Sequence, residues 1–459
     1  MYDFPIPRGE LDKMKPIKEK FGGRLAVIWA MAGSAIGLGN IWRFPYLVGQ
    51  NGGAAFIFIY MAAVLVLALP IFLAESVIGR RSGCDTFGAM NKLAPGSKWK
   101  WLGLLTVITP IILLSYYSVV GGWSVEYFFK ACCFSFDGNT QGLFARFISS
   151  TWAPIITHTL FIAATAIIIL LGVKKGIELF TKITMPLLLV LILFLAVYSV
   201  LLPGAGKGVE YLVKPDFSKV TADVVATAMG QAFFSLSLGV GTILTYASYV
   251  PKKENLMISA GGTAFFDLLF ALLAGLVVMP AVFAAGIRPG EGPGLVFDTL
   301  PFIFGQMHSV AGGVVALLFF LAILVAALTS SISLLEVGVA FLVQRRHGLS
   351  RQKATILLAI LTWLAGILCS LSFGPLADTK ILGKTFFDLF DSLCSNWLMP
   401  LGGLLFTLFA GWKMSKADVR DELTNGGSCN RTVFGVAYFL IRYVAPVGIV
   451  VVFLTNLFL

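Results

Sequence analysis

The sequence has few charges and few of the residues that enzymes and metalloproteins use. Only 12% of its 459 residues are Asp, Glu, Lys or Arg, about half the share of a soluble protein. The three His and six Cys are scattered without metal-ligand spacing, and no nucleophile–base pair or phosphate loop is recognisable. These absences argue against a soluble enzyme and against a metal or redox site. No cleavable signal peptide is predicted, because the first twenty residues are polar and basic.

Long apolar runs fill the chain instead. Hydrophobic residues make up 58% of it, and runs of about 18 residues or more recur from end to end. The sequence therefore predicts an all-α polytopic membrane protein. We expect eleven spans, near residues 24–48, 54–78, 101–131, 152–172, 183–202, 222–250, 256–285, 309–343, 354–372, 387–411 and 433–458.

The net charge of +11 lies mostly in short loops between these spans and serves as a topology signal, not as a nucleic-acid footprint. Placing the N-terminal segment 1–23 in the cytoplasm puts about 24 of the 34 Lys and Arg residues on that side. We therefore expect a multi-pass protein of the plasma or inner membrane. Its N-terminus would be cytoplasmic and, after eleven spans, its C-terminus extracytoplasmic.

The first and sixth spans are interrupted in similar ways. Residues 32–45 are apolar but hold three glycines together with Asn40 and Arg43, and residues 230–241 hold two serines and a Gly-Val-Gly. Each glycine weakens a helix by roughly 1 kcal/mol, and freed backbone groups persist in lipid only when buried in protein or lining a cavity. Close helix packing through small residues is the alternative for the glycines.

Two broken spans that are five apart predict two five-helix repeats of opposite orientation, a pattern typical of secondary transporters. We expect the repeats at 24–202 and 222–411, with a last helix at 433–459 outside them.

Several polar residues lie inside spans. The hydroxyls of 329–331 either bond back to the preceding turn or bind a hard cation such as Na⁺. Asp267, deep in the seventh span, must face a cation, a hydrogen-bond donor or water. Glu75 either accepts bonds from the amides of a broken helix or is a structural buried acid. Arg43 is the expected partner of one of two further acids, Asp391 and Glu336.

Four stretches together resemble the signatures of the neurotransmitter:sodium symporters. They are Gly33-Ser34-Ala35-Ile36-Gly37-Leu38-Gly39-Asn40-Ile41-Trp42-Arg43-Phe44-Pro45, Ser235-Leu236-Ser237-Leu238-Gly239-Val240-Gly241, Thr245-Tyr246-Ala247-Ser248-Tyr249 and Leu328-Thr329-Ser330-Ser331-Ile332. The resemblance covers nearly the whole chain. It implies the LeuT fold of the prokaryotic branch, a 5+5 inverted repeat with unwound helices 1 and 6 plus an eleventh helix.

The resemblance also implies two sodium sites and no organic cofactor. The residues in the positions of the first site are Ala35, Asn40, Ser235 and Asp267. The residues in the positions of the second site are Gly33, Ile36, Ala326, Thr329 and Ser330. The substrate carboxylate would complete the first site, so that Na⁺ and substrate stabilise each other's binding.

By the same resemblance the substrate would lie between the two breaks. The implied substrate-binding residues are Ala35, Leu38, Gly39, Leu113, Tyr117, Phe234, Ser235, Ser237, Val240, Ser331 and Leu334. The implied outer gate residues are Arg43, Asp391, Tyr117 and Phe234. Gly37 stands where monoamine carriers have an Asp, which indicates an α-amino-acid carrier. The apolar pocket predicts a neutral, hydrophobic L-amino acid, aliphatic or aromatic.

Gly176 and Pro186 match a helix-five unwinding motif of the family, although Pro186 alone could simply cap a first helical turn. Two positions depart from the family pattern. Lys18 matches the basic residue of the cytoplasmic gate, but its acidic partner aligns with Gln344. The carboxylate that replaces chloride in some members aligns with Ala271, so Asp267 would supply the fixed negative charge.

Sodium-coupled amino-acid symport by alternating access, independent of chloride, is the function that we expect. The alternatives are proton-coupled or exchange-type amino-acid transport, and a sensor that binds amino acids without transporting them. Enzyme activity and nucleic-acid binding are not expected, the expected partners being the substrate and the bilayer. The oligomeric state is not predicted.

Overall fold

The computed structural model describes residues 19–133, 136, 140, 142–287, 294–307, 309–345, 349–427 and 431–458. Over these residues the chain is helical, apart from one isolated bridge between Ile381 and Lys384. Nine helices of this part are long and apolar enough to cross a membrane, and the bent pair Arg24–Ala35 with Gly39–Gln50 makes a tenth. The sixth expected span consists of two helices, each too short to cross alone. The all-α membrane architecture is therefore confirmed.

The helices of the first five spans follow the predicted order. They are α2 (Arg24–Ala35) and α3 (Phe44–Gln50) joined by the π-helical turn η1 (Gly39–Arg43), α4 (Ala54–Ala63) and α5 (Leu69–Ser82) joined by η2 (Val64–Ala68), α7 (Lys100–Cys132), α9 (Trp152–Leu170), and η3 (Val173–Glu178) continuing into α10 (Leu179–Val200). The short helices between them are α6 (Thr86–Leu93), α8 (Leu143–Ser149), α11 (Gly206–Val213) and the 3₁₀ turn η4 (Phe217–Lys219).

The remaining spans also follow in order. They are α12 (Ala222–Ser235) with α13 (Thr242–Ser248), α14 (Leu256–Ala284), α16 (Ser309–Arg345), α17 (Arg351–Leu371), the run α18 (Phe386–Ser392), η6 (Leu393–Leu398), α19 (Met399–Leu408) and η7 (Phe409–Lys413), and the run α21 (Arg431–Phe439), η8 (Leu440–Val444) and α22 (Ala445–Phe458). The short helices are η5 (Leu295–Thr299), α15 (Leu300–Gln306) and α20 (Lys416–Leu423).

The fifth span begins at Val173, ten residues before the predicted start. The predicted start was wrong because the charged residues Lys174, Lys175 and Glu178 lower the hydropathy of this first helical turn, so that it does not look like part of an apolar span. The limits 24–202, 222–411 and 433–459 of the repeats remain a prediction.

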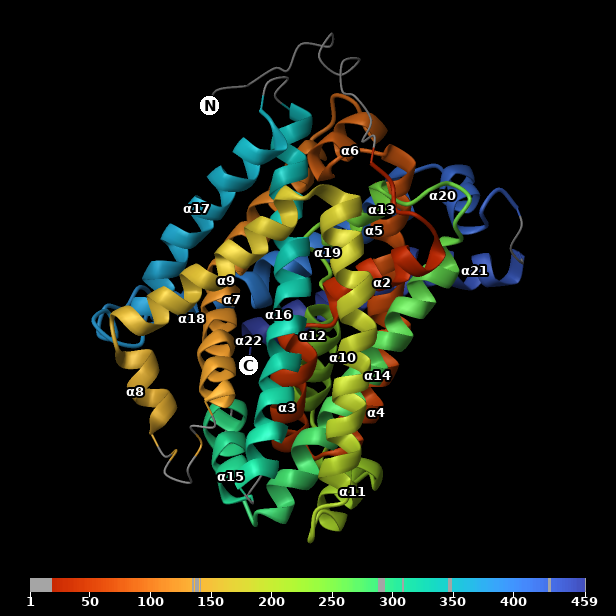
Figure 1. Ribbon diagram of the computed structural model, residues 1–459. Helices are drawn as coiled ribbons and strands as arrows, with labels where there is room; N and C mark the ends of the chain where they lie inside the picture. Colours follow the sequence, from red (N-terminus) through yellow and green to blue (C-terminus); the bar gives the residue numbers. More distant parts are fainter. Residues whose placement is uncertain are drawn as a thin grey trace.

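The short connecting helices gather at two opposite ends of the bundle (Figure 1). Helices α6 and α20 lie at one end and α8, α11 and α15 at the other. We call these the inner and the outer end, after the orientation predicted from the basic loops.

The first span breaks where the sequence predicts it. Helix α2 ends at Ala35, Ile36 has an extended backbone, and the two halves of the span are bent by 53°. Gly37 lies in the break, and a Cβ at this position would come within 2.8 Å of the Tyr117 hydroxyl oxygen. Glycine is therefore required here by the close approach of another helix.

The sixth span breaks over residues 236–241. Ser237, Gly239 and Gly241 have positive φ angles of 52°, 78° and 76°, which end α12 and start α13 in a new direction. Gly239 also packs directly on the backbone carbonyl of Met399, which leaves no space for a Cβ. Glycine supplies both the left-handed conformation and the close contact.

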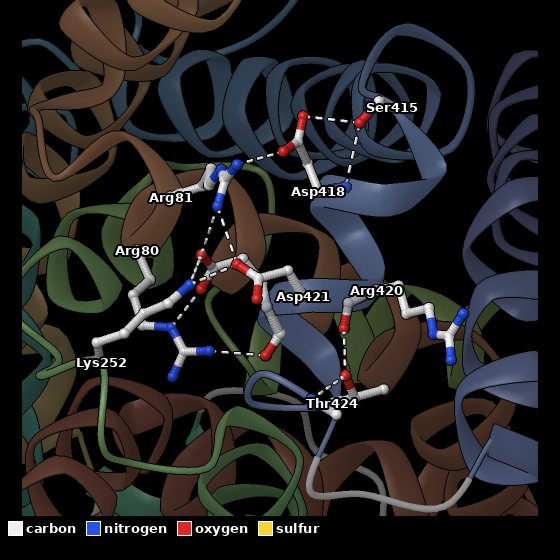
Figure 2. Close-up of polar contacts among 10 residues, drawn as sticks. Arg80, Arg81, Lys252, Ser415, Asp418, Arg420, Asp421 and Thr424 are labelled. Atoms are coloured by element: carbon white, nitrogen blue, oxygen red, sulfur yellow. Dashed lines mark hydrogen bonds and ion pairs between the residues drawn. The ribbon is translucent and has the colours of Figure 1, made fainter.

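At the inner end, α20 is held against α5 and the loop after α13 by a charged cluster (Figure 2). Arg80 of α5 donates to the Glu422 carboxylate at 2.5 Å and to its carbonyl at 2.6 Å, and both side chains are buried. Arg81 pairs with Asp418, and Lys252 donates to Asp421 at 2.9 Å. The hydrogen bond from Lys252 lowers the pKa of Asp421. Two spans and a surface helix are thus fixed to one another.

Candidate substrate and sodium sites

The two breaks lie against each other in the centre of the bundle. The Ser237 hydroxyl donates to the carbonyl of Ser34 at 2.8 Å, and the Ser34 hydroxyl donates to that of Ser333 on α16 at 2.8 Å. The first of these bonds gives the Ser34 carbonyl a partner where α2 ends, and the second joins α2 to α16. The freed backbone groups of both spans therefore meet in protein instead of in lipid, as a broken membrane helix requires.

Three of the four residues predicted for the first sodium site form one buried cluster. Asp267 accepts from the Asn40 amide at 2.8 Å and from the Ser235 hydroxyl at 2.7 Å, and all three side chains have no exposed surface. Ala35 lines the adjoining cavity. Tyr60 of α4, which the sequence did not single out, donates to the Asp267 carboxylate at 3.2 Å. Asp267 therefore has donors on every side, which explains how it is tolerated inside a span.

All five residues predicted for the second sodium site bring their oxygens together between α2 and α16. The Thr329 hydroxyl lies 2.9 Å from the carbonyl of Ala326 and 3.4 Å from that of Ile36. The Ser330 hydroxyl lies 3.5 Å from the carbonyl of Gly33 and 3.4 Å from that of Ile36. Hydroxyl and carbonyl oxygens are the ligands that hard cations prefer. In the part of the chain that the structure describes, no group of three or more His, Cys, Asp or Glu residues could hold a metal ion.

A small cavity of about 20 Å³ lies between the breaks, and we call it the substrate cavity. Its lining residues are Ala35, Gly37, Gly39, Leu113, Tyr117, Phe234, Ser237, Val240, Ser330, Leu334 and Met399. Eight of the eleven residues predicted to bind substrate are among them.

The predicted binding residues Leu38, Ser235 and Ser331 lie outside this lining. The Leu38 amide donates to the Tyr117 hydroxyl at 3.3 Å, directly beside the cavity, and Ser235 belongs to the Asp267 cluster. Ser331 is turned away, because its hydroxyl lies 2.8 Å from that of Thr165 on α9. In this conformation Ser330, and not Ser331, lines the cavity, so the role of Ser331 in substrate binding stays a prediction.

The four predicted gate residues line a second cavity of about 70 Å³, on the outer side of the first. The Arg43 guanidinium stacks over the Phe234 ring at 4.7 Å from its centroid. Asp391 faces the same cavity and accepts a bond from the Ser395 hydroxyl at 2.9 Å. Tyr117 and Phe234 separate the two cavities, since both line each of them.

Glu75 and helix five have clear roles in the packing. Glu75 accepts the Gly239 amide of the broken sixth span at 2.7 Å, the first of the two arrangements considered for it. The interval from Gly176 to Pro186 is helical throughout, with a π-helical turn at Val173–Glu178 and Pro186 inside α10. The unwinding of helix five is therefore not a feature of this conformation and stays a prediction.

The acid expected at the cytoplasmic gate is replaced by Gln344. Lys18 lies outside the described residues, and the Gln344 side chain accepts the Asp85 amide at 2.9 Å. Glu336 pairs instead with Arg351 at 2.6 Å, so Arg351, and not Arg43, is its basic partner.

Comparison with known proteins gives the class of protein to which these sites belong. The chain matches the sodium:neurotransmitter symporter family over residues 18–139 and 148–458. It is 39% identical to an uncharacterized sodium-dependent transporter of Bacillus subtilis, over 97% of this chain and 98% of the relative. A similar sodium-dependent transporter of Haemophilus influenzae is 36% identical, over 96% and 98%.

Among solved structures, MhsT in complex with L-phenylalanine superimposes with a TM-score of 0.89 and 42% identity, covering 96% of this chain and all of that one. MhsT has the LeuT fold, so the fold that we expected for this chain is confirmed. The protein is a sodium-dependent transporter, not an enzyme. More narrowly, the chain belongs to the sodium:neurotransmitter symporter family.

Proposed function

We propose that this protein is a symporter that carries neutral, hydrophobic L-amino acids into the cell with Na⁺. The observation that carries the proposal is the composition of the substrate cavity. Its polar groups are gathered at the break of the first span, where the Tyr117 hydroxyl meets the Leu38 amide. The opposite walls are the apolar side chains of Leu113, Val240 and Leu334.

Polar groups at one end of the cavity and apolar walls at the other suit an α-amino acid with an apolar side chain. Amides at the start of a helix and a hydroxyl donor bind a carboxylate well. No charged side chain lines the substrate cavity, so a cationic or anionic substrate side chain would be buried without a partner. The L-phenylalanine bound to MhsT supports the same substrate class.

We further propose two Na⁺ ions and no requirement for chloride. The first Na⁺ would lie at Ala35, Asn40, Ser235 and Asp267, and the second between α2 and α16 at the oxygens of Gly33, Ile36, Ala326, Thr329 and Ser330. The Asp267 carboxylate supplies a fixed negative charge beside the first ion, so that an additional anion is unnecessary. The N-terminus would face the cytoplasm, where the basic loops lie.

The test is uptake of tritiated leucine into proteoliposomes, in competition with all twenty amino acids. We expect Leu, Ile, Val, Met and the aromatic amino acids to compete, and Gly, Asp and Lys to fail. Preference for one of the last three would refute the substrate class. Uptake that disappears when gluconate replaces chloride would refute chloride independence.

A further inference from the structure

The substrate cavity is far too small for the substrates proposed above. Its volume of about 20 Å³ is room for roughly one water molecule. A larger cavity of about 200 Å³ adjoins it, and we call this the side cavity. Its lining residues are Arg43, Asp223, Ala226, Thr227, Gly230, Phe233, Phe234, Ser395, Asn396, Met399, Pro400 and Val452.

Only two residues line both the substrate cavity and the side cavity. They are Phe234 of α12 and Met399 of α19, so these two side chains form the partition between the cavities. Any enlargement of the substrate cavity toward the side cavity must move one of them.

Phe234 is held in place from both sides. Its ring packs so closely on Gly39 that a Cβ there would lie 2.9 Å from the ring. The Arg43 guanidinium covers the ring at 4.7 Å from its centroid, which adds a cation–π interaction. The ring is therefore the fixed part of the partition.

Met399 is the adjustable part. Its backbone cannot withdraw, because its carbonyl packs on Gly239 of the sixth-span break and Gly402, on the same helix, packs on the carbonyl of Gly239. Its side chain is buried, unbranched and has three rotatable bonds, so it can change rotamer into the side cavity. A rotamer change of Met399 can therefore enlarge the substrate cavity without any movement of α19.

The other apolar walls lack this freedom. Val240 is branched at Cβ and has few rotamers, and Leu113 and Leu334 lie on α7 and α16, which pack against each other. None of the three borders the side cavity. The larger of the two neighbouring cavities, the side cavity, is therefore reached past Met399, whereas the gate cavity of about 70 Å³ lies past Tyr117 and Phe234.

We propose that Met399 determines which side-chain sizes the transporter accepts. The further the Met399 side chain turns into the side cavity, the larger the substrate side chain that fits: a small turn admits an aliphatic side chain, and a full turn admits Phe or Trp. This inference rests on the proposed function, since it assigns the size limit of that same substrate site.

The experiment compares binding of tritiated leucine to the purified protein in Na⁺ buffer, displaced by Val, Phe or Trp. Met399→Ile introduces a β-branched, stiffer wall, and we expect it to weaken Trp relative to Val about tenfold. Met399→Ala removes the wall, and we expect it to strengthen Trp relative to Val by about threefold or more. Leu401→Ile makes a similar change on the exposed face of the same helix and should leave the ratio unchanged.

A Trp-to-Val affinity ratio within about twofold of the unmodified protein in both Met399 variants would overturn the inference. If Met399→Ile no longer folds, as judged by size-exclusion chromatography, Met399→Ala decides alone. The proposed function is tested separately by the unmodified protein: if it binds no leucine in Na⁺ buffer, that proposal fails before any variant is compared.

Discussion

Replacing Asp267 by asparagine should weaken Na⁺ coupling while preserving the fold. Asparagine has the size of aspartate and can keep one oxygen toward the amide of Asn40. Its new amide group would face the hydroxyls of Ser235 and Tyr60, which can rotate to accept it. The substitution therefore removes a negative charge from the cluster without leaving a cavity.

The magnitude follows from the burial of this charge. Asp267 has no exposed surface, so bulk water does not screen it. Two opposite unit charges about 4 Å apart interact by about 4 kcal/mol at the effective dielectric constant of protein sites, and the remaining amide dipole recovers part of this. We therefore expect Na⁺ affinity at this site to fall by about 2–4 kcal/mol, or about 30- to 1,000-fold.

The assay is leucine uptake into proteoliposomes as a function of Na⁺ concentration. The Na⁺ concentration for half-maximal uptake should rise steeply in Asp267→Asn and stay unchanged in Asp216→Asn, which makes the same change on an exposed outer loop. A shift of less than about threefold in Asp267→Asn would show that its charge does not act on Na⁺, and the reasoning would be refuted.

Three further predictions concern the substrate cavity and the charged cluster that holds α20 against α5. Arg80→Met removes the buried partner of the Glu422 carboxylate and leaves it only Lys252 and Arg81, so it should destabilise the protein by up to about 3 kcal/mol, seen as a lower melting temperature. Asp421→Asn removes an acid whose pKa is lowered by Lys252, so the variant should melt below the unmodified protein at pH 7. The difference should shrink as the pH falls below about 4, the pKa of an unfolded Asp, because the stabilisation is lost as pH falls through the folded pKa. Gly37→Ala crowds the substrate carboxylate position and should lower leucine affinity about tenfold or more.

The Arg80 prediction has a control variant, and each of the three predictions has a result that would contradict it. Arg81→Met breaks the pairs with Asp418 and Asp421, whose side chains are 38% and 39% exposed, and leaves Arg80 on Glu422, so it should destabilise by only about 0–1 kcal/mol. Equal melting temperatures of the Arg80 and Arg81 variants would contradict the claim that the buried Arg80–Glu422 pair contributes more to stability than the exposed pairs of Arg81. A difference in melting temperature between Asp421→Asn and the unmodified protein that does not shrink as the pH falls below about 4 would contradict its electrostatic origin. Leucine affinity unchanged by Gly37→Ala would contradict the position of the substrate.

The features that could be predicted from the sequence are those with a strong local signal. Glycines together with polar residues inside apolar runs mark both breaks, because close helix packing explains the glycines but not the polar residues among them. The resemblance to a known family then assigned oxygens to the second sodium site, and the five residues do lie together. A hydroxyl run such as 329–331 cannot alone distinguish back-bonding from cation binding, and the Thr329 hydroxyl makes a back-bond as well.

The features that were missed depend on how distant helices rotate and pack. Ser330 and Ser331 are neighbours in sequence, and only the contact of α16 with α9 determines which one faces the cavity. Tyr60 and Met399 come from helices whose local sequence shows no sign of a site. The partner of Glu336 lies across a loop, and no periodicity connects the two residues.

The most direct test of sodium-coupled transport is uptake of tritiated leucine driven by an inward Na⁺ gradient, with K⁺ as the control ion. The unmodified protein should accumulate leucine only with Na⁺. The double variant Thr329→Ala and Ser330→Ala, which removes both hydroxyls of the proposed second site, should abolish the accumulation. Accumulation that is equal in K⁺, or that survives in the double variant at low Na⁺, would contradict the account.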